Sequence, residues 1–336
     1  MSSTEAGGHD ISEGEDFMVK VPKGYRSKNV RDRRTSGGSG GGGRGFGFPR
    51  RSSSSGGGGL GGTMGGGALG GATAPGGQRR GCGGGMGIIL LLVLAFVVFS
   101  CVSGGGGGGN TTSTGSTSSG DGGFVAPNDP AYAAAEDLVN FVLDDVQDFW
   151  AAEFAASGQQ YPFATLTIFN DGVSTGGCGN ASSAVGPFYC PADNNAYIDI
   201  QYMLRLQDQL GAEGDFSQAY ILAHEIGHHV QNVLGTNDQV RRAQSGASRV
   251  QSNALQVAME LQADCLAGMW ARSAQDSGLL DAGDLQEGVR AASAVGDDAI
   301  TGSSNQENFT HGSSAQRVEW FQRGFEEQSY DACDTF

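Results

Sequence analysis

The residues with the clearest chemical potential stand in the stretch H-E-I-G-H at positions 224–228. On a helix, His224 and His228 lie one turn apart on the same face, so both imidazole rings can bind one metal ion. Glu225 is rotated about 100° from His224, close enough to hold a water molecule without binding the metal itself. His229 is rotated about 100° from His228, and we expect it to pack or to support a ligand. The spacing predicts one catalytic Zn²⁺ with Glu225 as general base.

A second pair of candidates lies in the stretch E-L-Q-A-D at positions 260–264. A catalytic zinc site usually takes three protein ligands and leaves one position for water. Glu260 and Asp264 are one helical turn apart, so both can face the helix that carries the histidines. We predict Glu260 as the third ligand and Asp264 as the residue that orients a ligand histidine by accepting its other ring N–H.

Peptide hydrolysis by such a site also needs a group that stabilises the developing oxyanion beside the metal. His311 is the candidate, because no other histidine downstream of residue 124 lies outside the stretch 224–229, and Arg317 is the alternative. A short strand candidate at 196–200 is predicted to be the sheet edge that pairs with an extended peptide substrate. The expected function is peptide-bond hydrolysis by zinc-activated water.

Hydrophobic periodicity supplies the elements that must position these residues. The apolar spacing predicts helices over residues 130–157, 216–234, 249–275, 281–295 and 313–328. Alternation predicts a strand within 161–169, and the Gly-, Ser- and Asn-rich stretch 172–195 is expected to be loop. Strands followed by helices predict an α+β domain, mainly helical with a small sheet.

Composition divides the chain of 336 residues into two pieces. Of the 59 glycines, 32 lie between positions 37 and 109, a stretch with too few apolar side chains to build a core. No three-residue period runs through these glycines, which excludes collagen. Up to residue 103 the chain has 12 basic and 6 acidic residues, whereas the remainder has 8 arginines, no lysine and 30 acidic residues. Only the second piece is long enough for a sizeable domain.

The two pieces meet at an uncharged apolar run over residues 86–102, at the short end of the length that spans a bilayer. Arg79 and Arg80 precede the run, so the positive-inside rule predicts a cytoplasmic N-terminus and an extracytoplasmic acidic domain. A buried core helix or a lipoprotein signal is the alternative for this run. The predicted organisation is a disordered cytoplasmic segment (1–85), a transmembrane helix (86–102), a flexible linker (103–123) and a metallopeptidase domain (124–336).

The expected partners are a peptide or protein substrate and the membrane. Seven basic residues between positions 20 and 34 are predicted to set topology and to touch anionic headgroups. No nucleic acid is expected, because Tyr25 is the only aromatic side chain near this cluster. The sequence makes no prediction of oligomeric state.

Four cysteines fall in the acidic piece, where an extracytoplasmic location would allow disulfides to persist. Cys178 and Cys190 bracket a turn-rich stretch and are the favoured pair, which leaves Cys265 to bond Cys333. Four cysteines allow three connectivities, so this pairing is a hypothesis.

The two motifs together resemble the bacterial neutral zinc metallopeptidase family. The resemblance rests on H-E-I-G-H-H-V-Q-N (224–232) and E-L-Q-A-D-C-L-A-G (260–268), with further likeness at 29–34, 182–193, 316–321 and 333–336. Membership would imply a zincin fold with a glutamate ligand and a membrane-anchored peptidase. A zincin-fold binding or scaffold module without turnover is the alternative, although the presence of Glu225 favours catalysis.

Overall fold

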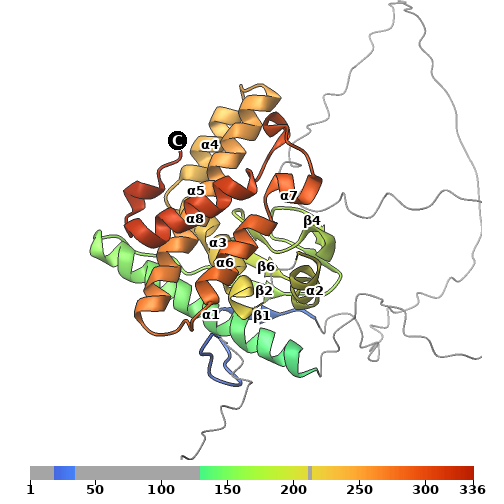
Figure 1. Ribbon diagram of the computed structural model, residues 1–336, viewed down its shortest axis with the longest axis vertical. Helices are drawn as coiled ribbons and strands as arrows, with labels where there is room; N and C mark the ends of the chain where they lie inside the picture. Colours follow the sequence, from blue (N-terminus) through green and yellow to red (C-terminus); the bar gives the residue numbers. More distant parts are fainter. Residues whose placement is uncertain (1–18, 35–128, 211–213) are drawn as a thin grey trace, which may run out of the picture.

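Residues 19–34, 129–210 and 214–336 are described by the computed structural model, and they form a mainly helical α+β domain with a small sheet (Figure 1). Five helices, α1, α3, α5, α6 and α8, confirm the five predicted helical segments to within a few residues. Three further helices, α2, α4 and α7, lie where no helix was predicted. The helices are α1 (Pro130–Ala156), α2 (Ile200–Leu210), α3 (Asp215–Val233), α4 (Thr236–Gln244), α5 (Arg249–Asp276), α6 (Asp284–Ala294), α7 (Asp297–Thr301) and α8 (Ser314–Glu327).

The main sheet has four strands in the order β1-β2-β6-β5. Neighbours β1 and β2 are parallel, as are β2 and β6, whereas β5 runs antiparallel to β6. A separate two-stranded sheet joins β3 to β4. The strands are β1 (Val30–Asp32), β2 (Thr165–Ile168), β3 (Gly172–Ser174), β4 (Asn180–Ser182), β5 (Phe188–Cys190) and β6 (Asn195–Ile198).

Two predictions about this sheet are wrong. The strand predicted as the substrate-binding edge corresponds to β6, which is hydrogen-bonded on both sides, so β5 lies at that edge instead. The stretch 172–195, expected to be loop, contains β3, β4 and β5. These strands are only three residues long, too short for their sequences to show the alternation that marks longer strands.

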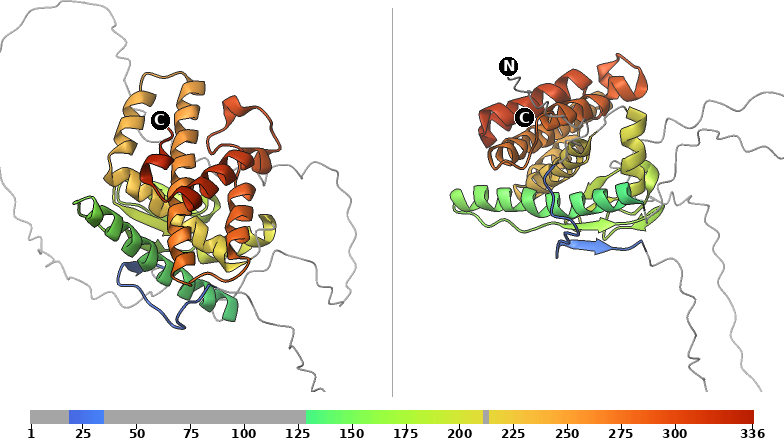
Figure 2. Two further views of the ribbon diagram at one scale, coloured as in Figure 1. Left: turned by 60° about the vertical axis from the view of Figure 1, so that its left-hand side comes forward. Right: turned by 60° about the horizontal axis from the view of Figure 1, so that its bottom comes forward.

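The helices pack across one another, and together with the sheet they enclose one hydrophobic core (Figure 2). Helix α1 begins at Pro130, where Asp129 caps the free backbone N–H of Ala131. Its apolar stripe includes Leu138, Val142 and Val146, which are buried in the same core as β2 and β6. This core joins the sheet to the helices that carry the predicted metal ligands.

Helices α5 and α8 approach each other closely because glycine stands at the contact. A Cβ atom added at Gly324 of α8 would lie 1.8 Å from the carbonyl oxygen of Cys265 on α5. A Cβ at Gly268 of α5 would lie 2.0 Å from the carbonyl oxygen of Phe321 on α8. Neither position can hold a larger residue without moving a helix, so glycine sets the distance between these two helices.

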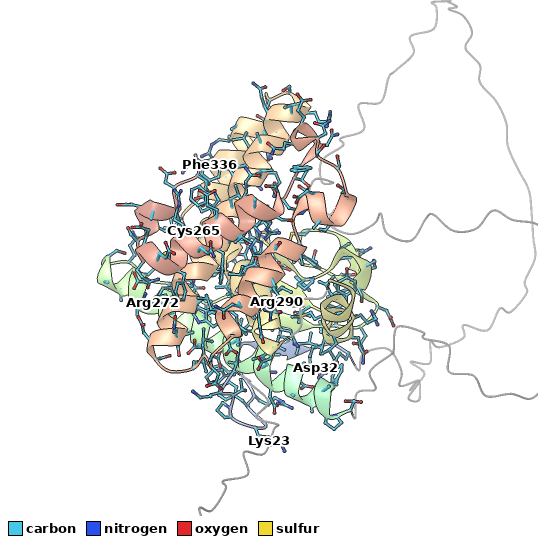
Figure 3. All side chains as sticks on the ribbon, in the orientation of Figure 1. Lys23, Asp32, Cys265, Arg272, Arg290 and Phe336 are labelled. Carbon is cyan, nitrogen blue, oxygen red and sulfur yellow. A yellow bond between two sulfur atoms is a disulfide. The ribbon has the colours of Figure 1, made fainter. Side chains whose placement is uncertain are left out.

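Residues 19–34 pack against the domain and contribute β1 to its sheet. Arg34 forms an ion pair with Glu136 at 3.0 Å and a hydrogen bond to the Tyr132 hydroxyl at 2.8 Å, both on α1. Tyr25 and Ser27 donate hydrogen bonds to Asp144 on the same helix. Figure 3 shows Lys23 and Asp32 of this segment beside α1.

The prediction of a disordered segment is therefore wrong for residues 19–34. Their basic side chains match an acidic face of α1, a contact between segments about 100 residues apart that local sequence patterns do not encode. The other residues of the predicted segment 1–85 lie outside the described residues, and so do the apolar run 86–102 and the linker 103–123.

The pairing of β1 with β2 also bears on the predicted membrane topology. A single crossing at residues 86–102 would place β1 and β2 on opposite sides of the membrane, where they cannot share a sheet. Among the helices of the described ranges, none combines the length and apolarity that a membrane span requires.

Both predicted disulfides are present in the structure. Cys178 bonds Cys190 and ties β5 to the loop after β3. Cys265 of α5 bonds Cys333, which fixes the C-terminal segment against the helix that carries Glu260. The structure thus selects one of the three connectivities that the sequence left open.

Candidate metal centre

Helices α3 and α5 bring the three predicted metal ligands together. One ligand atom from each of His224, His228 and Glu260 lies within 4.8 Å of the other two. The Nε2 atom of His224 is 3.2 Å from one Glu260 oxygen, and that of His228 is 3.6 Å from the other. Two imidazole nitrogens and a carboxylate form a donor set that suits Zn²⁺ and leaves a fourth position for water.

A glycine on α3 allows the two helices to come this close. A Cβ atom added at Gly227 would lie 3.0 Å from the carbonyl oxygen of Ala263 on α5, tighter than ordinary packing. Gly227 and Ala263 therefore let Glu260, one turn before Ala263, reach the histidines. Helix α5 itself begins at a capping box formed by Ser248 and Gln251.

Asp264 makes the hydrogen bond to a ligand histidine that the sequence predicted. One of its oxygens accepts from His224 Nδ1 at 2.8 Å and also from the Tyr220 hydroxyl at 2.6 Å. Arg317 of α8 donates to both oxygens, from Nε and from a terminal nitrogen, each at 2.8 Å. Asp264 is fully buried, so these donors replace the water that a carboxylate would otherwise bind.

Arg317 consequently does not occupy the place expected of an oxyanion stabiliser. Arg317 is 4 % exposed, and its guanidinium group lies behind His224, bound to Asp264 and to the carbonyl oxygen of Val295. The alternative prediction for Arg317 is wrong, because these contacts hold the side chain on the far side of the ligand.

The second ligand histidine has a support of its own. His228 Nδ1 donates to the Gln231 side-chain oxygen at 2.8 Å. The Gln231 amide nitrogen in turn donates to the Met259 carbonyl oxygen and to the side chain of Gln262 on α5. This chain of hydrogen bonds fixes the ring of His228 with its Nε2 atom facing Glu260.

Burial and charge oppose each other at these groups. Burial by itself would lower the pKa of His224, but the adjacent carboxylates of Asp264 and Glu260 raise it to about 9. Burial would raise the pKa of Asp264, but Arg317 and His224 outweigh it and lower that pKa to about 2. The pKa of Glu260 is likewise held well below its usual value, by the two histidines. Glu260 and Asp264 are therefore ionised in neutral solution.

Glu225 lies on α3 beside the ligands and is 8 % exposed. Burial raises the pKa of its carboxyl group, while the nearby histidines His228 and His224 act in the opposite direction. A raised pKa brings a carboxylate closer to the range in which it accepts and returns protons near neutral pH. Its position and its environment suit a general base.

His311 is buried and is held by Asp297 of α7. Its Nδ1 atom lies 3.0 Å from one Asp297 oxygen, and its backbone N–H donates to the other at 2.7 Å. The next residue, Gly312, lies against α5, where an added Cβ atom would be 3.3 Å from the side chains of Val257 and Leu261, so His311 stands beside the helix that carries Glu260. An Asp–His pair at this distance orients the imidazole and fixes its tautomer.

His229 takes no part in the ligand cluster, as the sequence predicted. It donates from Nε2 to the carbonyl oxygen of Pro162 at 2.6 Å and accepts from the Tyr189 hydroxyl at 2.8 Å. Burial lowers the pKa of this ring, which stays neutral. His229 thereby connects the zinc-motif helix to the edge strand β5, on which Tyr189 lies.

Two supporting residues, Tyr220 and Gln231, escaped the sequence analysis. Tyr220 is four residues before His224 and Gln231 three residues after His228, so both lie on the ligand face of α3. That helical spacing was the available signal. It could not be used without knowledge of which face of α3 meets α5.

Comparisons with known proteins agree with this site. The uncharacterised protein YpfJ of Escherichia coli K12 is 43% identical over 216 residues, which are 63% of this chain and 74% of YpfJ. The uncharacterised protein Rv2575 of Mycobacterium tuberculosis H37Rv is 45% identical over 186 residues, 51% of this chain and 61% of that protein. No solved structure matches the chain. The family model described as "Putative neutral zinc metallopeptidase" matches residues 50–336, and the chain belongs to this family.

Proposed function

We propose that this protein is a zinc-dependent metallopeptidase that hydrolyses peptide bonds. The observation that carries the proposal is the cluster of His224, His228 and Glu260 within 4.8 Å, with Glu225 next to His224 on the same helix. Zinc bound there would lower the pKa of a water molecule and polarise the carbonyl group of the substrate.

The chain's own residues supply the remaining steps. Glu225 accepts the proton of the attacking water and passes it to the leaving amine, a transfer that its raised pKa favours. Asp264 and Gln231 keep the ligand rings of His224 and His228 in place. His311, oriented by Asp297, donates a hydrogen bond to the oxyanion as negative charge develops.

We propose β5 as the strand that receives the substrate. It lies at the end of the described sheet, and Tyr189 in this strand is bonded to His229, the neighbour of ligand His228. An extended peptide that added to this edge would run past the metal ligands of α3. The substrate is thus a peptide or protein segment that can become extended.

We also propose an extracytoplasmic location for the domain. The two disulfides support it, because such bonds persist in oxidising compartments. Since β1 shares a sheet with β2, the proposal places residues 19–34 on the same side as the peptidase site, in place of the cytoplasmic location expected from Arg79 and Arg80.

The decisive experiment compares the wild-type chain with Glu225→Gln and His224→Ala. Zinc content by elemental analysis should be close to one per chain in the wild type and in Glu225→Gln, and strongly reduced in His224→Ala. Hydrolysis of a mixed peptide library should occur in the wild type alone, with a loss of at least 100-fold in both variants.

Three outcomes would count against the proposal. Cleavage that survives Glu225→Gln would exclude this residue as the general base. A zinc-loaded wild type that cleaves nothing in the library would favour a binding or scaffold module with the same fold. Absence of zinc from the wild-type protein would contradict both.

A further inference from the structure

A second group of carboxylates lies at the other end of the helix that carries the histidines. Asp215 is the first residue of α3, Asp284 is the first residue of α6, and Glu287 lies one turn further along α6. One oxygen from each of the three lies within 4.8 Å of the other two. Asp215 is nine residues before His224, or about 13 Å along the helix, so this cluster is separate from the candidate zinc site.

Each of these carboxylates uses one oxygen to accept a backbone hydrogen bond. Asp215 accepts from the N–H of Val19 at 2.7 Å, Asp284 from that of Asp281 at 2.8 Å, and Glu287 from that of Phe216 at 3.1 Å. These bonds fix the carboxylates in place. The Glu287 carboxylate is also seated against Gly214, where an added Cβ atom would lie 1.9 Å from its carbon.

Two oxygens in the cluster are buried and lack any partner. Asp284 is fully buried, and its second oxygen, Oδ1, has no hydrogen bond. The Oδ1 atom of Asp215 is in the same situation. Buried carboxylate oxygens without a donor are rare in folded proteins, because each one loses its hydration without compensation. These two oxygens therefore point to a ligand that supplies positive charge.

The surrounding side chains do not supply that charge directly. Among the ion pairs of the described residues, none involves Asp215, Asp284 or Glu287. Lys20 forms an ion pair with Asp281 at 3.0 Å and donates to the Gly278 carbonyl oxygen, and its side chain is 58% exposed. Arg290, labelled on α6 in Figure 3, acts on Glu287 through its charge alone.

Burial and mutual repulsion make the ionisation of these carboxylates less favourable. Burial, with repulsion from Asp284, raises the pKa of Asp215 to about 6. Burial, with repulsion from Asp215 and Asp284, raises that of Glu287 to about 7. Three neighbouring carboxylates with raised pKa values need positive charge beside them. Bound protons or a bound cation can supply it.

The donor atoms indicate which cation would fit. The set consists of carboxylate oxygens alone, without nitrogen or sulfur, and this favours a hard ion over zinc. Ca²⁺ accepts irregular sets of oxygen ligands completed by water, whereas Mg²⁺ requires near-octahedral geometry and is seldom held by three protein carboxylates. Calcium is also compatible with an oxidising compartment, where the disulfides belong.

We propose that Asp215, Asp284 and Glu287 bind one Ca²⁺ ion that joins the first turns of α3 and α6. Because Asp215 also accepts from Val19, the ion would strengthen the attachment of residues 19–34 to the domain. Its role is structural, since it holds the start of the helix on which His224, Glu225 and His228 lie. The proposal is independent of peptidase activity.

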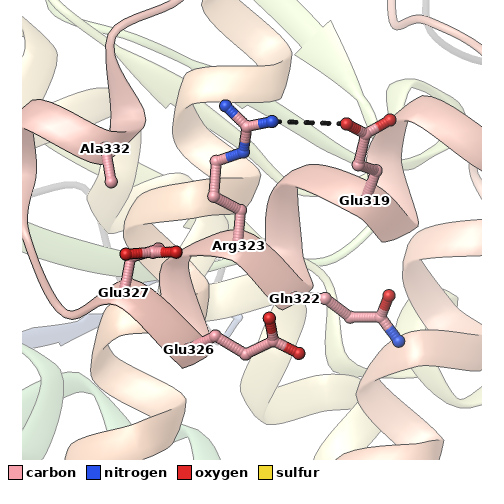
Figure 4. Close-up of a pocket in the computed structure, with 6 residues that line it drawn as sticks. All are labelled: Glu319, Gln322, Arg323, Glu326, Glu327 and Ala332. Carbon is pink, nitrogen blue, oxygen red and sulfur yellow. Dashed lines mark hydrogen bonds and ion pairs between the residues drawn. The ribbon is translucent and has the colours of Figure 1, made fainter.

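A second acidic cluster provides a matched comparison. Glu319, Glu326 and Glu327 of α8 surround a surface pocket together with Arg323, whose guanidinium forms an ion pair with Glu319 at 3.3 Å (Figure 4). Glu326 is exposed, and water can solvate its carboxylate. Loss of one charge at Glu326 should leave calcium binding unchanged.

The experiment uses the full chain, purified in detergent and freed of divalent ions except zinc. Titration with CaCl₂ should show one saturable site by calorimetry and a rise of several degrees in the thermal midpoint. Asp284→Asn and Glu287→Gln should each weaken calcium affinity at least tenfold and abolish the rise, whereas Glu326→Gln should retain both. Two variants are used so that one that fails to fold does not decide the result.

Several outcomes would overturn the proposal. They are absence of saturable calcium binding in the wild type, unchanged binding in both Asp284→Asn and Glu287→Gln, and equal or tighter binding of Mg²⁺. A wild-type protein that becomes more stable from pH 8 to pH 5 but does not respond to calcium would show that the cluster holds protons instead.

Discussion

Asp264 connects a candidate metal ligand to two other buried side chains. It accepts hydrogen bonds from His224, Tyr220 and Arg317, and it joins the ligand helix to both α5 and α8. Since the group is fully buried, no water can replace a lost partner. We therefore expect both metal affinity and folding to depend on this residue.

The first prediction concerns Asp264→Asn. We expect zinc affinity to fall by about 10- to 100-fold, because an amide orients His224 less strongly than a carboxylate does. The free energy of unfolding should fall by about 3–5 kcal/mol, since Arg317 is left as an unpaired buried charge. Competition with a chromogenic chelator and chemical denaturation measure the two effects.

The exposed acid Asp276 on the same helix supplies the control. Asp276→Asn should change neither zinc affinity nor stability by more than about 0.5 kcal/mol. Tyr220→Phe removes a single donor to Asp264 and should reduce stability by about 1.5–3 kcal/mol, with zinc still bound. An unchanged zinc affinity in Asp264→Asn would refute the orienting role.

The second prediction concerns His311 and separates substrate turnover from metal binding. In His311→Gln we expect kcat to fall by about 10²- to 10³-fold with zinc content unchanged, because the lost hydrogen bond acts on the developing oxyanion. Steady-state kinetics on a cleaved peptide and elemental analysis are the measurements. A rise in KM with kcat unchanged would instead assign His311 to substrate binding.

At the scale of elements, the distance between helices is set by small residues. Glycine and alanine stand at the crossings of α3 with α5 and of α5 with α8, and the same helices carry the ligands and their supports. Because Arg317 of α8 reaches Asp264 of α5, a shift of α8 would be felt at the metal ligands. We therefore expect helix packing and metal binding to be coupled.

The third prediction tests this coupling with Gly324→Ala. The added methyl group would collide with the backbone of Cys265, so we expect a loss of about 1–3 kcal/mol in the free energy of unfolding, together with weaker zinc binding. Gly246→Ala is the control, because an added Cβ there meets nothing within 4 Å. The measurements are thermal unfolding and zinc titration of both variants. A Gly324→Ala variant as stable as the wild type would contradict the proposed coupling.

At the scale of the molecule, residues 19–34 are joined to the domain through a sheet, an acidic helix face and a buried residue. Val19 is 3 % exposed within the core, and its N–H donates to Asp215 at the start of α3. The segment therefore completes the fold, although about 95 residues separate it from α1 in the sequence.

The fourth prediction places this segment and the peptidase domain on the same side of the membrane. In a Cys82→Ser, Cys101→Ser background, a membrane-impermeant maleimide applied to intact cells should label Lys23→Cys and Glu326→Cys equally. Both positions are exposed in the structure. Labelling of Glu326→Cys alone would show that residues 19–34 lie across the membrane, and β1 would then not form in the cell.

The candidate catalytic motif could be predicted from the sequence because its geometry is local. The positions of His224, Glu225 and His228 relative to one another follow from one helical turn, and the composition of α5 marked Glu260 and Asp264 as acids in an apolar helix. The main helices were predicted for the same reason, since each has its own periodic apolar stripe.

Only the tertiary structure decided which surfaces meet. It placed β5 rather than β6 at the edge, Arg317 behind His224, β1 in the sheet, and Asp215 beside Asp284 and Glu287. These contacts join residues that are far apart in the chain, and no short-range spacing specifies them. The sequence by itself determined the chemistry of one helical turn, whereas packing between helices determined what supports that chemistry.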